Sequence, residues 1–166
     1  MTSTITIRCQ TGDELVVNAS SLAGADLSGA ALHRALLDGE DLHGAKLVAA
    51  DLRAAWLERA DLSGCDLTRS ILFGAVAADA SFVGASLRGA VLSTGTFDRA
   101  DFTNADLSAA RIGQGSFKGA KFQGANLRCE SVQGADFNGA EGDTSTRWPD
   151  GFDPAAHGVR VQEASR

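Results

Sequence analysis

Residues 22–64 read LAGADLSGAALHRALLDGEDLHGAKLVAADLRAAWLERADLSG, and every fifth residue of this stretch is leucine. The same frame continues without a slip to Phe137, and Ala77 is the one position where the large apolar residue is missing. A small residue, usually alanine, stands two positions before each large one. A straight strand repeats every two residues and an α-helix about every 3.6, so neither keeps a five-residue series on one side. The chain must therefore bend once in every five residues.

The two residues that follow each large residue are expected to form the bend. Glycine often occupies the second of them, as at Gly24, Gly29 and Gly44. Glycine adopts the dihedral angles of tight turns without steric cost. Repetition of one bent unit predicts a solenoid, in which each coil stacks on its neighbours.

These units resemble the pentapeptide-repeat family, whose consensus is Ala, then Asp or Asn, then Leu and two variable residues. Clean copies begin at Ala25, Ala60, Ala105 and Ala125, and the resemblance covers about residues 17–140. It implies an all-β fold, a right-handed quadrilateral β-helix (solenoid) of about six coils, each with four pentapeptides and 20 residues. We expect residues 1–16 to form an N-terminal β-hairpin, 17–140 the β-helix, and 141–166 a C-terminal capping segment.

The large residues themselves support a 20-residue coil. One face sorted at that spacing carries Leu37, Leu57, Ala77, Phe97, Phe117 and Phe137. Beside two of these rings the usual alanine is replaced by glycine, at Gly95 and Gly115. A smaller neighbour for a larger ring keeps the core volume constant, as close packing requires. We therefore expect each ring to occupy the space that the missing methyl group leaves.

The two ends of the solenoid must be covered, because open ladders invite aggregation. Alternation over residues 4–8, a turn at 11–14 and a second apolar run at 15–17 predict the hairpin. In the tail, Trp148 and Phe152 are predicted to fold over the last core ring as a hydrophobic cap, in preference to a ligand site. Residues 154–157 are expected to form a short helical turn, and 162–166 to fray.

Composition and charge limit the classes of function. The net charge is −6, and residues 17–140 carry 14 acidic and 11 basic side chains, a net −3. This balance argues against direct nucleic-acid binding, which needs a basic surface. The sequence contains no run of 18 apolar residues, so we expect no membrane span. The first residues show no signal-peptide pattern. Three cysteines lack metal-like spacing, so we expect reduced thiols and a cytoplasmic protein, with Cys65 in the core and Cys129 a free surface thiol.

Outward-facing aspartates stack at 20-residue spacing in two neighbouring files. The candidate acidic face comprises Asp41, Asp61 and Asp101 in one file and Asp26, Asp66 and Asp106 in the other. The family resemblance implies one use for such a face, because some relatives are DNA mimics that bind DNA gyrase and protect against quinolones. Mimicry needs carboxylates spaced like phosphates over a long surface, and Lys46 and Lys121 interrupt these files. The alternative is that aspartate bonds the backbone of its own turn.

A second outward-facing group is apolar. Leu36, Trp56 and Val76 are spaced by 20 residues, and Ile71, Phe73 and Val91 lie across the neighbouring corner. A contiguous exposed apolar patch suggests a protein partner, and tryptophan dominates interface hot spots. Alternatively, the hairpin or the tail covers these side chains, or they lie flat on the rod. Self-association through Trp56, and hence a homodimer, is one possible outcome.

Candidate catalytic groups are sparse. Glu40 and Glu130 occupy inward small positions, where an unpaired charge is costly, so each is expected to bend outward near an end of the rod. The three histidines, at positions 33, 43 and 157, form no recognisable metal cluster or catalytic triad. We therefore expect no enzyme activity and no cofactor. The favoured hypothesis is a scaffold that binds another protein of unknown identity, and the alternative is a gyrase-binding DNA mimic.

Overall fold

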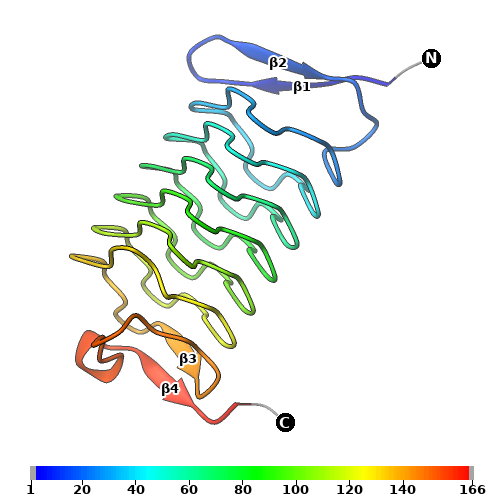
Figure 1. Ribbon diagram of the computed structural model, residues 1–166. Helices are drawn as coiled ribbons and strands as arrows, with labels where there is room; N and C mark the ends of the chain where they lie inside the picture. Colours follow the sequence, from blue (N-terminus) through cyan, green and yellow to red (C-terminus); the bar gives the residue numbers. More distant parts are fainter. Residues whose placement is uncertain (1–2, 165–166) are drawn as a thin grey trace.

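The computed structural model describes residues 3–164, which form a rod of stacked coils (Figure 1). Parallel bridges join residues 20 apart in successive coils, for example Leu36 with Trp56 and Trp56 with Val76. Four such ladders run along the rod, and each begins at a different corner-to-corner segment of the first coil, at residues 26, 31, 36 and 41. The coil length of 20 residues that the sequence predicts is therefore confirmed.

The large residues of the five-residue frame fill the interior of the rod. All of them from Leu22 to Phe137 are buried except Val132, which is partly buried. The C-terminal half of this core is aromatic, with two columns formed by Phe82, Phe102 and Phe122, and by Phe97, Phe117 and Phe137. Rings within a column are stacked with centroids 4.8–5.5 Å apart. Rings of different columns meet tilted or edge to face at 5.8–6.0 Å.

Gly95 and Gly115 make room for these rings, as the sequence predicts. A Cβ atom at Gly95 would lie 2.6 Å from Cε2 of Phe97, and one at Gly115 would lie 2.8 Å from Cε2 of Phe117. Neither glycine has a positive φ. Space, and not backbone conformation, therefore requires glycine at both positions.

The second corner residue has a left-handed backbone conformation in nearly every repeat. Gly24 and Gly29 have φ of 69° and 67°, but glycine is not obligatory there. Eleven other residues adopt φ of 51–60°: Arg34, Ala49, Ala54, Arg59, Arg69, Asp79, Thr94, Arg99, Asn104, Ala109 and Gln114. This conformation costs about 1–2 kcal/mol for a residue with a side chain. The hydrogen bonds to the coils on either side outweigh that cost, so the corner shape follows from the stack more than from the local sequence.

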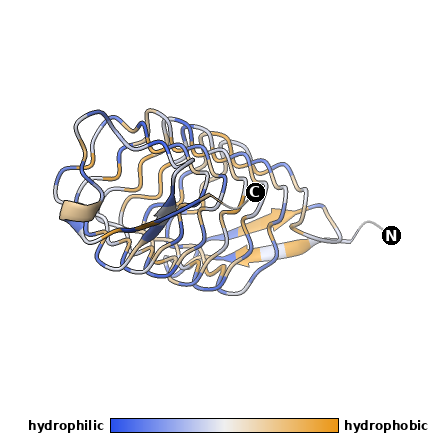
Figure 2. Ribbon diagram, turned by 90° about the horizontal axis from the view of Figure 1, so that it is seen from below, coloured by the Kyte–Doolittle hydropathy of each residue, from blue (hydrophilic) through white to orange (hydrophobic). Residues whose placement is uncertain are grey.

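An antiparallel hairpin precedes the first coil. Strand β1 (Ile5–Arg8) pairs with β2 (Glu14–Val17), and the hydropathy colours show both as mostly apolar (Figure 2). The end of β1 and the residue after it bond to the first coil at the ladder of Leu36. There Cys9 forms an antiparallel bridge with Ala35, and the N–H of Leu36 donates to the carbonyl of Arg8 at 2.8 Å.

The C-terminal segment lies across the last coil. Strand β3 (Glu141–Asp143) pairs in parallel with β4 (Arg160–Gln162), and between them lies one 3₁₀ turn, η1 (Ala155–His157). Trp148 meets Phe137 edge to face with centroids 5.9 Å apart. Phe152 lies 5.4 Å from Phe137 and stacks on Trp148. The aromatic columns of the core thus end under these two rings.

The prediction that residues 162–166 fray is wrong for the part that the structure describes. Gln162 belongs to β4, and the N–H of Ala164 donates to Oγ1 of Thr144 at 3.1 Å. Pairing with β3 holds this segment in place, and the periodic sequence pattern does not predict this pairing. Residues 165 and 166 lie outside the described residues.

Candidate protein-binding surface

The six predicted apolar side chains lie on two adjacent ladders and on the corner between them. We call Leu36, Trp56, Ile71, Phe73, Val76 and Val91 the apolar patch. Leu36, Trp56 and Val76 are stacked by successive bridges, as are Ile71 and Val91. The exposed fraction is 43% for Leu36, 36% for Trp56 and Ile71, and 48% for Phe73. Val76 and Val91 are half-buried. The stacking prediction is confirmed, and four of the six side chains are clearly exposed.

The backbone holds the apolar patch rigidly. The N–H of Trp56 donates to the carbonyl of Ala35 at 2.9 Å, and the carbonyl of Trp56 accepts from Leu37 at 2.9 Å. Residues on both sides of Trp56, Ala55 and Leu57, are completely buried. The indole is therefore carried by a backbone segment that is fixed between two core residues, so binding need not order the backbone at Trp56.

The hairpin and the tail do not cover the apolar patch. The exposed fractions above include every described residue from 3 to 164, and hence both end segments. Of the two alternatives that the sequence leaves open, burial beneath an end segment is therefore wrong for this structure.

Charged pairs lie close to the apolar patch. Asp51 is the bridge partner of Ile71, and its carboxylate accepts from the guanidinium of Arg53 at 2.6 and 2.8 Å. This hydrogen-bonded contact lowers the pKa of Asp51 below its ordinary value, against the opposing effect of burial. Asp79, three residues after Val76, pairs in the same way with Arg99 at 2.6 Å. An apolar centre with polar, solvent-accessible groups nearby is the usual anatomy of a protein interface.

The predicted acidic files are stacked as expected, and each aspartate has a local structural role. Asp41 bridges Asp61, and Asp26 and Asp66 both bridge Lys46. All six carboxylates accept a hydrogen bond from the N–H two residues later, at 2.9–3.1 Å. At Asp61, hydrogen bonds from the side chain and backbone of Ser63 lower the pKa of the carboxyl. Turn capping therefore accounts for aspartate at these positions.

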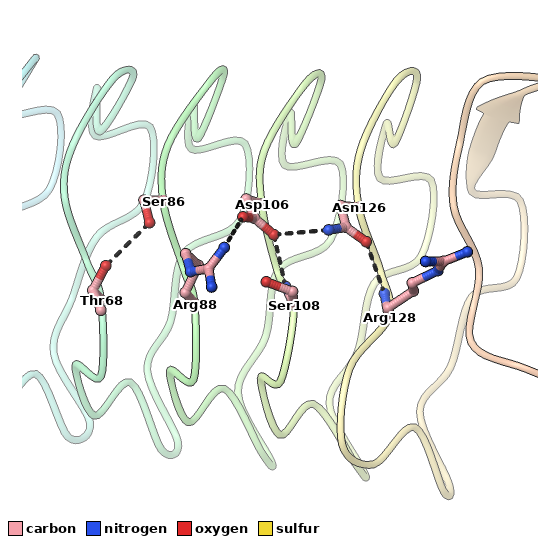
Figure 3. Close-up of polar contacts among 7 residues, drawn as sticks. All are labelled: Thr68, Ser86, Arg88, Asp106, Ser108, Asn126 and Arg128. Atoms are coloured by element: carbon pink, nitrogen blue, oxygen red, sulfur yellow. Dashed lines mark hydrogen bonds and ion pairs between the residues drawn. The ribbon is translucent and has the colours of Figure 1, made fainter.

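The carboxylate of Asp106, on the candidate acidic face, is already hydrogen-bonded to neighbouring residues (Figure 3). It accepts from Arg88 at 3.1 Å, from the Ser108 N–H at 3.0 Å and from the side-chain amide of Asn126 at 3.1 Å. Burial raises the pKa of Asp106, but the bonds from Ser108 and Arg88 outweigh it, so the pKa lies below its ordinary value. In the other file, Lys121 pairs with Asp101 at 3.8 Å.

The remaining predicted groups include Glu40, Glu130 and His157. Glu40 and Glu130 are exposed, as expected for charges at inward positions near the ends. The ring of His157 stacks on Phe152 with centroids 4.3 Å apart. Across residues 3–164, no three His, Cys, Asp or Glu side chains are grouped closely enough to hold a metal ion. The same described residues include no helix long and apolar enough to cross a membrane.

The cysteines differ in part from the prediction. Cys65 is buried in the core, where burial raises the pKa of its thiol to about 11. Cys129 is half-buried, not a surface thiol, and its Sγ lies 2.9 Å from the carbonyl of Leu127. The corner at Cys129 differs from the regular ones, because the N–H of Cys129 donates to the Leu127 carbonyl of its own turn, at 2.6 Å.

Comparison with known proteins identifies the family. The family model for pentapeptide repeats matches in eight copies, over residues 25–64, 45–75, 55–93, 70–108 and 80–119, and thus over more than half of the chain. The chain therefore belongs to the pentapeptide-repeat family, and this membership implies a right-handed β-helix. No curated protein sequence matches the chain.

Several solved structures resemble the chain. The pentapeptide repeat protein alr5209 of Nostoc is 32% identical over 68% of this chain and 84% of its own, with a TM-score of 0.39. HetL of Nostoc is a pentapeptide repeat protein involved in heterocyst differentiation regulation. It is 25% identical over 86% of this chain and 75% of its own, with a TM-score of 0.46. QnrB1, a plasmid-mediated fluoroquinolone resistance protein, is 14% identical over 84% of this chain and 80% of its own, with a TM-score of 0.43. All three TM-scores are below 0.5, so these likenesses carry no argument about function.

Proposed function

We propose that this protein is a non-enzymatic scaffold that binds another protein, and that the apolar patch is the centre of its binding surface. The observation that carries the proposal is the exposure of Leu36, Trp56, Ile71 and Phe73 on rigid, adjacent ladders. Membership of a repeat family built on stacked coils favours an interaction protein over an enzyme. The three free cysteines favour a reducing compartment, and we place the protein in the cytoplasm on that basis.

The size of the apolar patch constrains its partner. A standard interface buries about 800 Å² on each side, whereas the largest apolar patch on an ordinary monomer covers about 300–600 Å². Of the six side chains of the apolar patch, two are half-buried. We therefore expect the partner to contact residues around the apolar patch as well, such as Arg53 and Arg99, with Trp56 as its anchor.

Gyrase binding by DNA mimicry is the weaker hypothesis. Its support is the stacking of aspartates in two neighbouring ladders. The charge density opposes it, because B-DNA carries about one negative charge per 1.7 Å, or about 17 over the length of about six coils stacked about 4.8 Å apart. Residues 17–140 carry a net −3. A gyrase supercoiling assay with added protein, with and without a fluoroquinolone, would support mimicry if it showed an effect that is lost when Asp61, Asp66, Asp101 and Asp106 become Asn.

The scaffold proposal is tested by comparing protein capture among matched variants. Trp56→Ser and Phe73→Ser remove anchors from the apolar patch, while Val161→Ser removes an apolar side chain at the C-terminal end that is as exposed as Phe73. Immobilised wild-type protein and Val161→Ser should retain the same partner from an extract of the source cells, and both patch variants should lose it. Loss of one buried hot-spot side chain costs about 2 kcal/mol or more, about a thirtyfold weaker affinity. Equal retention by all four proteins would refute the proposal.

A further inference from the structure

The first coil has an open hydrogen-bonding edge at its N-terminal end. In the second coil, Lys46 donates its N–H to Ala25 at 2.9 Å, its carbonyl accepts from Leu27 at 2.7 Å, and the carbonyl of Val48 accepts from Gly29 at 2.8 Å. The corresponding groups of the first coil are the N–H and C=O of Asp26 and the C=O of Ser28. Within residues 3–164, these three groups form no hydrogen bond.

The hairpin fills the edge of the first coil at the ladder of Leu36, two ladders along from Asp26, and leaves it open at Asp26. The carbonyl of Arg8 accepts the N–H of Leu36, so an extended segment of the chain already serves as the missing rung at that ladder. At the ladder of Asp26, strand β2 stands apart from the coil. The structure therefore contains one ladder of the first coil to which an extended segment has been added, in antiparallel orientation, and another ladder of the same coil that is unfilled.

A groove separates β2 from the open edge. It has a volume of ≈ 350 Å³ and is lined on one side by Leu15, Val16 and Val17 and on the other by the segment from Asp26 to Ala30. Val16 is 58% exposed. Ala25 and Ala30 are also partly exposed, whereas the equivalent alanines of the next coil are completely buried. An apolar wall from β2 and unpaired backbone groups of the first coil thus meet in one groove.

We propose that this groove binds an extended peptide segment of a partner protein, which adds a strand to the first coil. Main-chain bonds to a sheet edge give affinity in such strand addition, and side-chain pockets give specificity. The hydrogen bonds between the later coils show which backbone groups a bound peptide must supply to the first coil. The peptide supplies one C=O to the Asp26 N–H and two N–H groups, two residues apart, to the carbonyls of Asp26 and Ser28.

The occupant's side chains follow from the same pattern. On this ladder, in the five units that begin at residues 25, 45, 65, 85 and 105, the residue that supplies the C=O is small, the first donor is leucine, and the second donor stands at a left-handed corner position. A segment with the order small, any, large apolar, any, glycine satisfies all three requirements. This surface is separate from the apolar patch, so the inference does not depend on the function proposed above.

The test uses a peptide with the sequence of residues 83–91, VGASLRGAV, which carries this order at Ala85, Leu87 and Gly89. The peptide is titrated to about 1 mM, the weak limit of specific binding, into ¹⁵N-labelled full-length protein. Saturable shifts should centre on Asp26 and Ser28, and the Asp26 amide should exchange with solvent at least about tenfold more slowly when the peptide is bound. The Lys46 amide, bonded with or without peptide, is the internal control.

Two matched controls make the test specific. A peptide with N-methyl-leucine at the Leu87 position keeps the side chain but lacks one donor, and it should bind at least about fivefold more weakly. Val17→Asp, in the groove, should abolish binding, and Val161→Asp, at the other end, should not. No saturable binding, equal binding of the N-methyl peptide, or an Asp26 amide already protected in the dilute free protein would overturn the proposal. Protection that instead grows with protein concentration, together with a doubled mass, would identify a second copy as the occupant and also overturn it.

Discussion

Replacement of Gly95 by alanine tests the packing rule of the aromatic core. The new methyl group would lie 2.6 Å from Cε2 and 3.0 Å from Cζ of Phe97, and 3.1 Å from the carbonyl oxygen of Ala75. The Phe97 ring is held by stacking on Phe117 at 5.2 Å and by the edge of Phe82 at 6.0 Å. Overpacking of a core costs about 1–3 kcal/mol. Alanine recovers about 0.4–1 kcal/mol by restricting the unfolded chain, so we expect a net loss of about 1–2 kcal/mol.

Thermal unfolding followed by circular dichroism measures this loss, which corresponds to a decrease in Tm of about 2–8 °C for a chain of this size. Phe97→Leu in the same molecule removes the clashing ring edge, so the double variant should be more stable than the sum of the single effects by about 1 kcal/mol. Gly89→Ala is the control, because its φ of 63° makes alanine unfavourable while its nearest contact is Arg69 Cγ at 3.7 Å. Its cost should not change with Phe97→Leu. A neutral Gly95→Ala, or a cost that Phe97→Leu leaves unchanged, would refute the reasoning.

Two further predictions concern the corners and the aspartates. Ala109→Gly should raise the stability by about 0.5–1 kcal/mol, because φ at Ala109 is 56° and glycine removes that strain; urea unfolding measures it, and no gain would contradict the strain argument. The Tm should be constant from pH 7 to about 5 and decrease on further acidification. The reason is that hydrogen bonds hold the folded-state pKa values of Asp26 and Asp61, and also of Asp106 against burial, below the unfolded value of about 3.9. Stability from these groups is therefore present above the unfolded pKa and is lost as the pH falls through the folded one. Asp106→Asn should make the decrease shallower, and an identical pH profile for this variant would contradict the assignment.

The repeat region was predictable because one geometric rule acts on every residue in it. A period of five excludes straight strands and helices, and the spacing of 20 predicts that Leu36 lies over Trp56, which the bridge between them confirms. The replacement of alanine by Gly95 indicated a ring in the space beside it, and Phe97 occupies that space. The same periodicity carries no information about whether a corner residue is glycine or another type in the left-handed region, because the stacked coils impose the conformation.

The end segments were less predictable because they are not periodic. The last ladder step joins Asn126 to Arg147, a spacing of 21 residues. The extra residue falls in the turn after β3, where the buried carboxylate of Asp143 accepts from the N–H groups of Ser145 and Thr146 at 3.0 Å. Residues 160–162 are held by pairing with β3 and by bonds from Arg160 to the carbonyls of Ala140 and Gly139, and a sequence pattern of period five cannot indicate these contacts. Likewise, the exposure of the apolar patch depended on where the end segments lie.

Site-specific crosslinking tests the central claim, that the apolar patch is a protein-binding surface, most directly. The photoreactive residue p-benzoylphenylalanine would replace Phe73, which is 48% exposed, and in a separate protein Val161, which is 49% exposed. After irradiation in source cells, we predict one defined protein adduct from position 73, its loss when Trp56→Ser is added, and no such adduct from position 161. The same adducts from both positions, or an adduct from position 73 that Trp56→Ser leaves unchanged, would contradict the account.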